Sequence, residues 1–379
     1  MIDIIYLQNK FKNIFGTEGV PYSAPGRINL IGEHTDYNNG FVFPGAIDKG
    51  ISAIVWPNNT SQVNLYADDL QMQCSFDIFD KEGPDTIHFR YVYGVIQELL
   101  SKGTKVLGFD AIYGGDIPLG AGLSSSAALE SCFAYALNDI FGDDTLDRLQ
   151  LARIGQATEH KYVGVKCGIM DQFISLFGQE NKLVRLDCRS GEYKYYPWNP
   201  KGFKLLLIDS RVKHELVGSP YNERRLSCER VAKTAGVNSL RECTWEQLES
   251  IRNKISEEDY KRARYVLGET DRVMSVCDAL EKNDYYCVGK QMYLTHEGLS
   301  KYYEVSCIEL DYLVEQAQQY GIAGSRIMGG GFGGCTINLI QEELYESFIK
   351  NISQSYHKTF GITCKPIPVV IGSGARKIN

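Results

Sequence analysis

The chain has 379 residues, of which 44% are hydrophobic and 23% are charged, and its formal net charge is -7. This length exceeds the size at which a single hydrophobic core usually stops growing, so we expect two packed domains. The acidic balance argues against a nucleic-acid partner, which would require Lys and Arg gathered on one face. Any anionic ligand must therefore be held by local structure rather than by overall charge.

The hydrophobic pattern predicts neither a targeting segment nor a membrane span. Residues 1–16 break their apolar positions with polar ones and carry the early acidic Asp3, so they predict an amphipathic helix rather than a secretory signal. The longest apolar runs, such as residues 205–208, are only as long as a strand. The 11 cysteines are scattered without a CxxC pair, which favours buried free thiols. We therefore expect a cytoplasmic protein without membrane contact.

The first half of the chain predicts strands joined by loops and then one strong helix. Residues 21–56 alternate short apolar runs with glycines and polar clusters, and residues 109–113 form another strand candidate. A glycine-rich stretch follows. Apolar residues between positions 129 and 140 then fall on one helical stripe, which Gly142 could terminate. The expected order is strand, glycine-rich loop, helix.

The second half opens with the apolar run KLLLID at residues 204–209 and continues through charged helical stretches. It then reaches a second glycine cluster, followed by the strand-like CTINLI at residues 335–340. A polar, Pro-containing stretch supports a boundary near residue 195, which would give domains 1–195 and 196–379. The last strand-like segment, IPVVIG, could return to the first domain.

A candidate phosphate site lies in GAGLSSSAALE, residues 120–130, which opens the predicted helix. Glycines allow a close approach of the backbone to an anion, exposed amides form a nest, and the helix N-terminus adds about half a positive charge. Such a loop would let an acidic protein bind a triphosphate. An ordinary Ser-capped helix is the alternative. The loop is not a Walker A sequence, because the chain contains no GxxxxGK[ST].

The second glycine cluster, MGGGFGG at residues 328–334, formally contains GxGxxG. A dinucleotide-binding loop should open a helix, whereas the residues after this cluster predict a strand. A tight hairpin that needs positive φ is one interpretation. Because five glycines in six positions carry a heavy entropy cost on folding, we favour a close approach of this backbone to a ligand or to a partner loop.

A third motif, GRINLIGEHTDY at residues 26–37, concentrates polar side chains after a predicted strand. A strand followed by a turn could aim several of them at one polyhydroxy ligand, because carboxylates and imidazole exchange hydrogen bonds with vicinal hydroxyls. A polar surface loop is the alternative. The residues concerned are Arg27, Asn29, Glu33, His34 and Asp36.

The three motifs occur together and in the order found in the GHMP kinases, and the third resembles the signature of galactokinases, continuing through residues 38–48. The other two resemble that family's phosphate loop and its C-terminal glycine motif. Two further segments fit the same family: CGIMDQF, residues 167–173, and SPYNERR, residues 219–225. The resemblance implies a two-domain α/β (α+β) GHMP kinase fold with the active site in the cleft between the domains.

The resemblance also implies an enzyme, a galactokinase that transfers the γ-phosphoryl group of ATP to the C1 hydroxyl of D-galactose and forms galactose 1-phosphate and ADP. Asp171 and Arg27 would be its catalytic residues. Arg27 would stabilise charge on the transferring group and favour the ionised form of Asp171, which would accept or orient the hydroxyl proton. Without the family, Asp171 could equally be a helix N-cap.

The same resemblance assigns binding residues. Galactose would contact Glu33, His34, Asp36, Gly168 and Tyr221. ATP would contact Gly120, Ala121, Gly122, Leu123, Ser124, Ser125, Ser126, Ala127 and Tyr91. Mg2+ would accompany ATP as the cofactor, held by Ser126 and by Glu159, which the spacing favours over His160. Around Tyr91, His88 and Arg90 depart from the family pattern.

Two alternatives remain open at this stage. One is another GHMP small-molecule kinase, such as an N-acetylgalactosamine kinase, and the other is a catalytically silent galactose sensor on the same scaffold. Such sensors lack part of the serine-alanine segment of the phosphate loop, whereas Ser126 and Ala127 are both present here. Galactose and ATP are the expected small-molecule partners, and the protein is expected to be a monomer.

Overall fold

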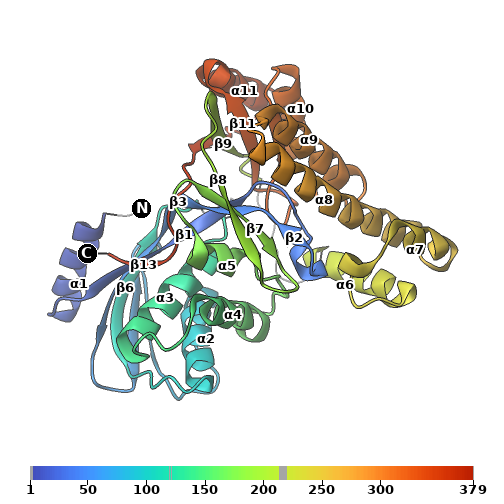
Figure 1. Ribbon diagram of the computed structural model, residues 1–379. Coiled ribbons are helices and arrows are strands. Elements are labelled where there is room, and N and C mark those ends of the chain that lie inside the picture. Colours follow the sequence, from blue (N-terminus) through green and yellow to red (C-terminus); the bar gives the residue numbers. More distant parts are fainter. Residues whose placement is uncertain (1–2, 119, 121, 213–219, 379) are drawn as a thin grey trace.

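The computed structural model describes residues 3–118, 120, 122–212 and 220–378. Its N-terminal half is built on a six-stranded sheet and its C-terminal half on a four-stranded sheet, and a smaller three-stranded sheet is also present. Figure 1 shows one group of helices against the large sheet and a second group, from the C-terminal half, around the four-stranded sheet. Helices and strands are therefore mixed in both halves.

The six-stranded sheet has the order β13-β1-β3-β6-β4-β5, in which β4 and β6 pair in parallel and the other neighbours are antiparallel. β13 comes from the end of the chain and pairs with β1, so the C-terminus lies near the N-terminal helix in Figure 1. The strands are β13 (Arg376–Lys377), β1 (Val20–Asn29), β3 (Pro44–Pro57), β6 (Phe109–Gly115), β4 (Gln62–Ala67) and β5 (Met72–Asp77).

Helices cover both faces of this sheet. Leu7 and Phe11 of α1 pack with Ile54 and Ile112, whereas the neighbouring residues of the same strands face α3 in the main core. The predicted amphipathic N-terminal helix and the predicted helix ending at Gly142 are both confirmed. The helices of this half are α1 (Ile4–Phe15), α2 (Ile87–Ser101), α3 (Ser125–Phe141), α4 (Arg148–Thr158) and α5 (Met170–Phe177).

The four-stranded sheet has the antiparallel order β10-β11-β9-β12. The predicted strands at residues 204–209 and 335–340 are confirmed as β9 and β11, which pair with each other. The strands are β10 (Gly324–Ile327), β11 (Cys335–Gln341), β9 (Phe203–Asp209) and β12 (Lys365–Pro368). The helices are α6 (Pro220–Ala235), α7 (Trp245–Ser250), α8 (Glu257–Glu281), α9 (Tyr285–Lys301), α10 (Ile308–Gln319) and α11 (Tyr345–Phe360).

Short elements complete the chain between and beside the larger ones. The three-stranded sheet has the order β2-β7-β8. Its strands are β2 (Phe41–Val42), β7 (Lys182–Asp187) and β8 (Tyr193–Pro197). The short helices are η1 (Asp36–Asn38), η2 (Glu159–Val163), η3 (Leu240–Glu242), η4 (Arg252–Lys254) and η5 (Glu342–Leu344).

The two halves share one continuous core. Leu30 and Phe133 of the N-terminal half belong to the same buried cluster as Val276 of α8 and Ile337 of β11. Such a core places the ends of β1 and α3 against elements from the C-terminal half. Polar residues at those ends are therefore brought together from segments that are far apart in the sequence.

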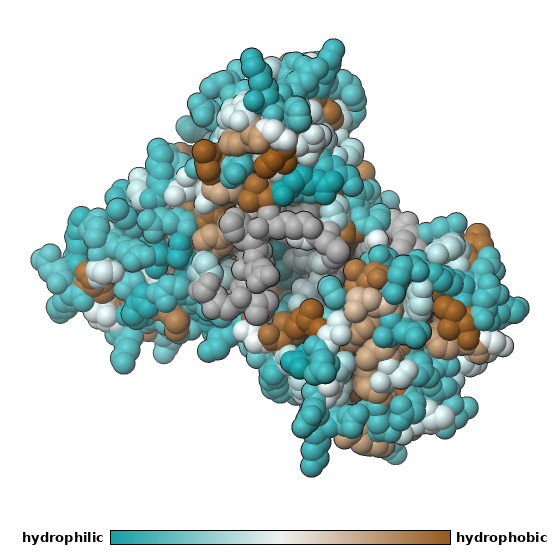
Figure 2. All heavy atoms as spheres, turned by 180° about the vertical axis from the view of Figure 1, so that it is seen from behind, coloured by the Kyte–Doolittle hydropathy of each residue, from teal (hydrophilic) through white to brown (hydrophobic). Residues whose placement is uncertain are grey.

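The surface is consistent with a chain that buries its apolar residues. Figure 2 shows a face that is mainly hydrophilic, with hydrophobic residues in separate small groups. Among the described residues, no helix combines the length and the apolar character that crossing a bilayer requires. All eleven cysteines are free and none is fully exposed, so the expectation of free thiols is confirmed.

Candidate active site

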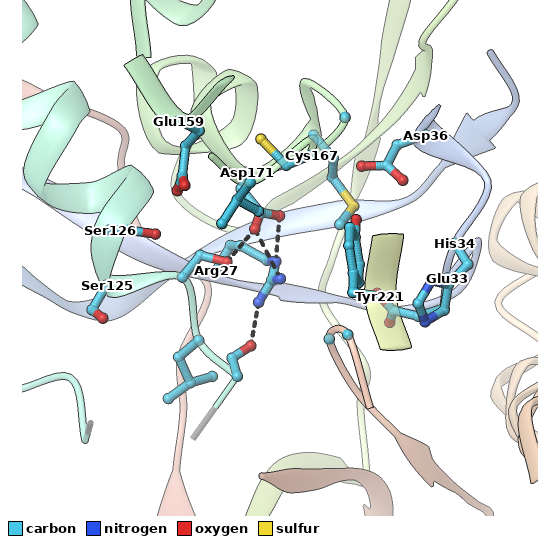
Figure 3. A pocket seen from close by; sticks show the side chains of 18 of the residues that line it. Arg27, Glu33, His34, Asp36, Ser125, Ser126, Glu159, Cys167, Asp171 and Tyr221 are labelled. Atoms are coloured by element: carbon cyan, nitrogen blue, oxygen red, sulfur yellow. Dashed lines mark hydrogen bonds and ion pairs between the residues drawn. The ribbon is translucent and has the colours of Figure 1, made fainter. Parts of the chain in front are cut away.

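A cavity of about 220 Å³ lies where the third motif meets the phosphate loop, α5 and the second glycine cluster. We call residues 29–36 the sugar loop and residues 120–126 the phosphate loop. Figure 3 shows the side chains that converge on the cavity from these segments. The predicted site residues that line it are Arg27, Glu33, His34, Asp36, Gly120, Gly122, Leu123, Ser124, Ser125, Ser126, Glu159, Gly168, Asp171 and Tyr221.

Three predicted residues stand apart from this set. Ala127 is buried in α3 and does not line the cavity. Tyr91 of α2 does not line it either, although burial raises its pKa and the Ser126 hydroxyl is close enough to oppose that rise. Ala121 lies outside the described residues. Tyr91 therefore lies beside Ser126 of the phosphate loop.

The two glycine segments approach each other through their backbones. Gly122 has a φ of +71°, and a Cβ there would lie 3.2 Å from the carbonyl oxygen of Met328. Gly329 has a φ of +82°, and a Cβ there would lie 3.2 Å from the carbonyl oxygen of Gly122. The second cluster also connects β10 to β11, which form an antiparallel pair. It is thus a hairpin connection, and its predicted close approach to a partner loop is confirmed.

The start of α3 does not follow the ordinary Ser-capped pattern. Ser124 occupies the capping position in the left-handed region, at φ 57° and ψ 53°, and its side chain makes no capping hydrogen bond. Its hydroxyl donates instead to the carboxylate of Asp171. The first N–H groups of α3 are therefore left without a side-chain cap, as an anion-binding helix start requires.

Arg27 is aimed at the cavity by an irregularity in β1. The pairing of β1 with β3 shifts register between Pro25 and Arg27, and such a bulge redirects the side chain that follows it. The buried guanidinium donates from Nε to Asp171 Oδ1 at 2.8 Å and from Nη2 to Oδ2 at 3.1 Å. Nη1 donates to the Gly122 carbonyl at 2.5 Å. Arg27 therefore joins the phosphate loop to Asp171.

Asp171 lies in the first turn of α5, where the N-capping position belongs to Ile169. The N-cap interpretation of Asp171 is therefore wrong. Its carboxylate receives the two bonds from Arg27 and one from Ser124, and its side chain is 29% exposed. A carboxylate held by a bidentate guanidinium has a fixed orientation, and its remaining exposure is toward the cavity that it lines.

Residues 29–35 of the sugar loop are buried and Asp36 is partly buried, so the interpretation of this motif as a polar surface loop is wrong. Glu33 is 3% exposed and His34 is 4% exposed. Burial and the nearby Arg224 charge together lower the pKa of His34 to about 3, so the imidazole is neutral. His34 Nδ1 lies 2.7 Å from the hydroxyl of Tyr37, and the ring of Tyr221 lies 5.6 Å from the ring of His34.

Asp36 faces the segment that precedes α5. A Cβ on Gly168 would lie 2.6 Å from the Cβ of Asp36, so only glycine allows these two segments to meet. Burial and the nearby Asp171 charge together raise the pKa of Asp36 to about 7. The cavity therefore has a fixed carboxylate at Asp171 and a second one that titrates near neutral pH.

Glu159 and Ser126 form a second polar group at the other end of the cavity. Glu159 begins η2, a five-residue π-helix, and π-helical turns are frequent at functional sites. Burial raises the pKa of Glu159 to about 7, even though its hydrogen bond with Ser126 opposes the rise. His160 instead points out, with Nε2 2.8 Å from the carbonyl of Cys167. The two predicted metal ligands thus lie together, and His160 lies apart from them.

Sequence reasoning missed several residues of the site. Cys167 and Gly330 line the cavity, whereas Glu130 does not line it but is fully buried on α3, where it accepts a hydrogen bond from Gln172. Ser124 was predicted as an ATP contact and not as a partner of Asp171. A buried glutamate on an otherwise apolar helix face could have drawn attention to Glu130. The other contacts depend on segments distant in the sequence and leave no local signal.

Three family models match the chain. They are described as the galactokinase galactose-binding signature, at residues 9–57, the GHMP kinases N terminal domain, at residues 90–179, and the GHMP kinases C terminal, at residues 277–358. A galactokinase of Thermotoga petrophila is 38% identical over 94% of this chain and 99% of its own length. A galactokinase of Fusobacterium nucleatum is 38% identical over 97% of this chain and 98% of its own length.

Solved structures agree with these matches. The Lactococcus lactis galactokinase complexed with galactose superposes with a TM-score of 0.94 at 34% identity, covering 98% of each chain. The Methanococcus jannaschii mevalonate kinase superposes with a TM-score of 0.67 at 18% identity, covering 96% of this chain and 99% of its own. The latter likeness concerns the fold alone.

The fold and both domain matches define a GHMP kinase, as the sequence predicted. Within that class, the chain belongs to the galactokinase family. The predicted kinase activity and galactokinase function are confirmed by relatives that match over nearly the full length, and the family implies the use of ATP.

Proposed function

We propose that the chain phosphorylates the C1 hydroxyl of D-galactose with ATP, and that the sugar and the γ-phosphate meet at Asp171 and Arg27. One observation carries this proposal: Asp171 lines the cavity between the sugar loop and the phosphate loop, bonded to Arg27 and Ser124. In Figure 3 the sugar-loop residues lie on one side of this pair and Ser125, Ser126 and Glu159 on the other.

Phosphoryl transfer requires an acceptor hydroxyl in line with the γ-phosphorus and neutralisation of charge on the transferring group. Asp171 is the carboxylate that accepts the hydrogen of the C1 hydroxyl and so orients the attacking oxygen. Arg27 contributes positive charge beside it and holds its orientation through the bidentate pair. The protein's own hydrogen bonds therefore hold both catalytic side chains in a fixed mutual orientation.

The sugar side would recognise hydroxyl groups through buried acceptors. Glu33 and Asp36 offer carboxylate oxygens, neutral His34 can donate or accept, and Tyr221 closes the pocket. Gly168 leaves room for Asp36. A buried group that loses its hydroxyl partner costs about 1–3 kcal/mol, so this pocket should separate galactose from its epimers.

The phosphate loop would hold the triphosphate through backbone N–H groups at the start of α3. Ser126 and Glu159 suit Mg2+, which in phosphate-transfer sites takes one or two protein oxygens and completes its shell with phosphates and water. Among the described residues there is no group of three or more His, Cys, Asp or Glu that could hold a metal without such a substrate. When bound, the ion would neutralise charge on the phosphate oxygens.

Two further expectations belong to this proposal. The chain would divide near residue 195 into an N-terminal domain that carries the sugar and phosphate loops and a C-terminal domain that carries the second glycine cluster, with β13 returning to the first. The protein would act as a cytoplasmic monomer, and the eleven free thiols suit a reducing compartment.

A coupled ADP-release assay tests the proposed substrate. We expect rapid turnover with galactose, and little with glucose, N-acetylgalactosamine, arabinose or mevalonate. Phosphorus NMR of the product should show a phosphate on C1. A clear preference for N-acetylgalactosamine would replace the substrate but keep the kinase, whereas galactose binding without ADP release would support the silent sensor.

A further inference from the structure

The sugar loop belongs to the N-terminal half, yet side chains from the C-terminal half hold its backbone. Two fully buried charged residues make most of these contacts, Glu269 of α8 and Arg326 of β10. Neither lines the cavity. We propose that Glu269 and Arg326 are positioning residues of the galactose site: they fix Glu33 and the sugar-loop backbone, and so set galactose affinity. This inference deepens the proposed function and rests on it.

Arg326 is bonded almost entirely to the sugar loop. Its Nη1 donates to Glu33 Oε2 at 2.8 Å, its Nε donates to the carbonyl of Leu30 at 3.0 Å, and its Nη2 donates to the carbonyl of Asn29. The ion pair is dry, since the two side chains are 0% and 4% exposed. Only a planar guanidinium offers donors in these several directions at once.

This arrangement fixes one oxygen of Glu33 and leaves the other for a ligand. Oε2 is held by Arg326, whereas Oε1 has no hydrogen bond within the described part of the chain. Glu33 itself lines the cavity. Arg326 also supplies the opposite charge that a buried carboxylate requires. The pair therefore presents a carboxylate in one orientation to a sugar hydroxyl.

Glu269 holds the loop from the other side. Its Oε1 accepts the backbone N–H of Gly32 at 2.8 Å and that of Glu33 at 3.4 Å. Its Oε2 accepts from Arg272 Nε at 2.6 Å and from the hydroxyl of Thr295 at 2.8 Å. Each oxygen of this buried carboxylate thus has two donors. Replacing Oε2 by an amide nitrogen would set a donor against the Arg272 and Thr295 donors.

The loop needs such support because its backbone is unusual. Gly32 has a φ of +89° and His34 a φ of +61°, and His34 is a non-glycine residue in the left-handed region. Conformations of this kind persist when the surroundings over-determine them. Glu269 accepts from the consecutive N–H groups of Gly32 and Glu33. The hydroxyl of Tyr265 donates to the Glu33 carbonyl at 2.9 Å.

The test compares Glu269→Gln and Arg326→Lys with a matched control, Arg230→Lys. Arg230 also pairs with a carboxylate in the C-terminal half, Asp259, but does not touch the sugar loop. For each variant we would measure the KM for galactose, the KM for ATP, the unfolding midpoint, galactose binding by calorimetry and hydrogen exchange of the backbone amides of residues 30–36.

We expect both site variants to raise the galactose KM and Kd by about tenfold or more while the ATP KM stays within about twofold. Glu269→Gln should also speed hydrogen exchange at the amides of Gly32 and Glu33. The control Arg230→Lys should change neither the galactose affinity nor this exchange. If a site variant fails to fold, Thr295→Val is the substitute, because it removes one bond to Glu269 and should shift the galactose KM in the same direction by a smaller factor.

Unchanged galactose binding and unchanged exchange in the folded variants would overturn the inference. Equal increases in the KM for galactose and for ATP would overturn it as well, since they would indicate general loosening. The ADP-release assay on the wild-type protein separates failure of this inference from failure of the proposed function. If wild type releases no ADP with galactose, the proposed function fails, and exchange of the Gly32 and Glu33 amides still decides whether Glu269 and Arg326 hold the loop.

Discussion

The two ends of the cavity are built from different parts of the polypeptide. At the sugar end, the chemistry comes from buried side chains such as Glu33 and His34, which other buried side chains hold in place. At the phosphate end, the surface comes largely from backbone, where Gly122 and Gly329 meet with positive φ and a Cβ on either would be in tight contact with a carbonyl oxygen. Asp171 and Arg27 stand between the two ends.

This difference suits the two ligands. Epimers of a sugar differ only in the direction of a hydroxyl, and fixed side-chain acceptors can detect that. A triphosphate is a strong anion with many equivalent oxygens, and peptide N–H groups at a helix start bind it without selecting a precise side-chain partner. Substitutions at the two ends should therefore separate sugar recognition from nucleotide binding, and a substitution between them should impair the transfer itself.

The largest effect is expected between the two ends. Asp171→Asn keeps the shape of the side chain but removes the acceptor for the hydroxyl proton, so kcat should fall by roughly 10²-fold or more while galactose still binds. Turnover measured by ADP release, with galactose binding measured by calorimetry, checks this expectation. Near-wild-type turnover in a folded Asp171→Asn protein would remove Asp171 from the chemical step.

At the phosphate end, Gly122→Val should raise the ATP requirement by about tenfold or more and leave galactose affinity largely intact. A valine would be strained at a φ of +71°, and its Cβ would press on the Met328 carbonyl at 3.2 Å. Gly103→Val is a matched control, because Gly103 has a φ of +89° but nothing within 4 Å of its Cβ position.

Calorimetry with a non-hydrolysable ATP analogue would measure nucleotide binding in both proteins. We expect weak binding only in Gly122→Val. Unchanged nucleotide binding in that variant would move the triphosphate away from the phosphate loop.

The contrast between the ends also explains what the sequence could predict. The glycines and serines of the phosphate loop are contiguous in the chain, and the sequence predicts the helix that follows them. The polar residues of the sugar loop are also contiguous, and the sequence predicts the strand that precedes them. Asp171 could be assigned only through the family resemblance, because its partners Arg27 and Ser124 are remote in the sequence.

Tertiary contacts set the remaining features. Nothing local to Arg326 or Glu269 indicates that each is fully buried against the sugar loop, because the strand and helix that carry them meet that loop only after the halves pack. The same holds for Ser124, whose hydroxyl would by ordinary propensity cap α3 but is drawn to Asp171. The final strand-like segment IPVVIG is divided between the halves: Ile367 and Pro368 pair with β9 as part of β12, whereas Ile371 forms a β-bridge with Ile47 of β3 in the N-terminal half.

At the sugar end, Asp36→Ala should relax or abolish the preference for galactose over glucose by about tenfold to a hundredfold, without weakening ATP binding comparably. The reason is that a partly buried acceptor that lines the cavity would be lost while the phosphate loop is unchanged. Specificity constants for the two sugars measure the effect. A preserved preference in Asp36→Ala would show that other residues of the sugar loop read the hydroxyl that differs between these epimers.

The smallest effect expected concerns pH and Mg2+ at Glu159, whose pKa is raised by burial from 4.5 to about 7. Only the ionised carboxylate can hold a cation, so affinity for the ion should weaken as pH falls through 7. With that pKa, about one tenth of the carboxylate is ionised at pH 6 and about nine tenths at pH 8, so the Mg2+ requirement should be roughly tenfold higher at pH 6.

Glu159→Gln should need more Mg2+ at both pH values and lose this pH dependence. Measuring the Mg2+ requirement at saturating galactose limits the influence of Asp36, and comparing the two proteins cancels the protonation of ATP itself. The same pH dependence in both proteins would exclude Glu159 as the titrating ligand.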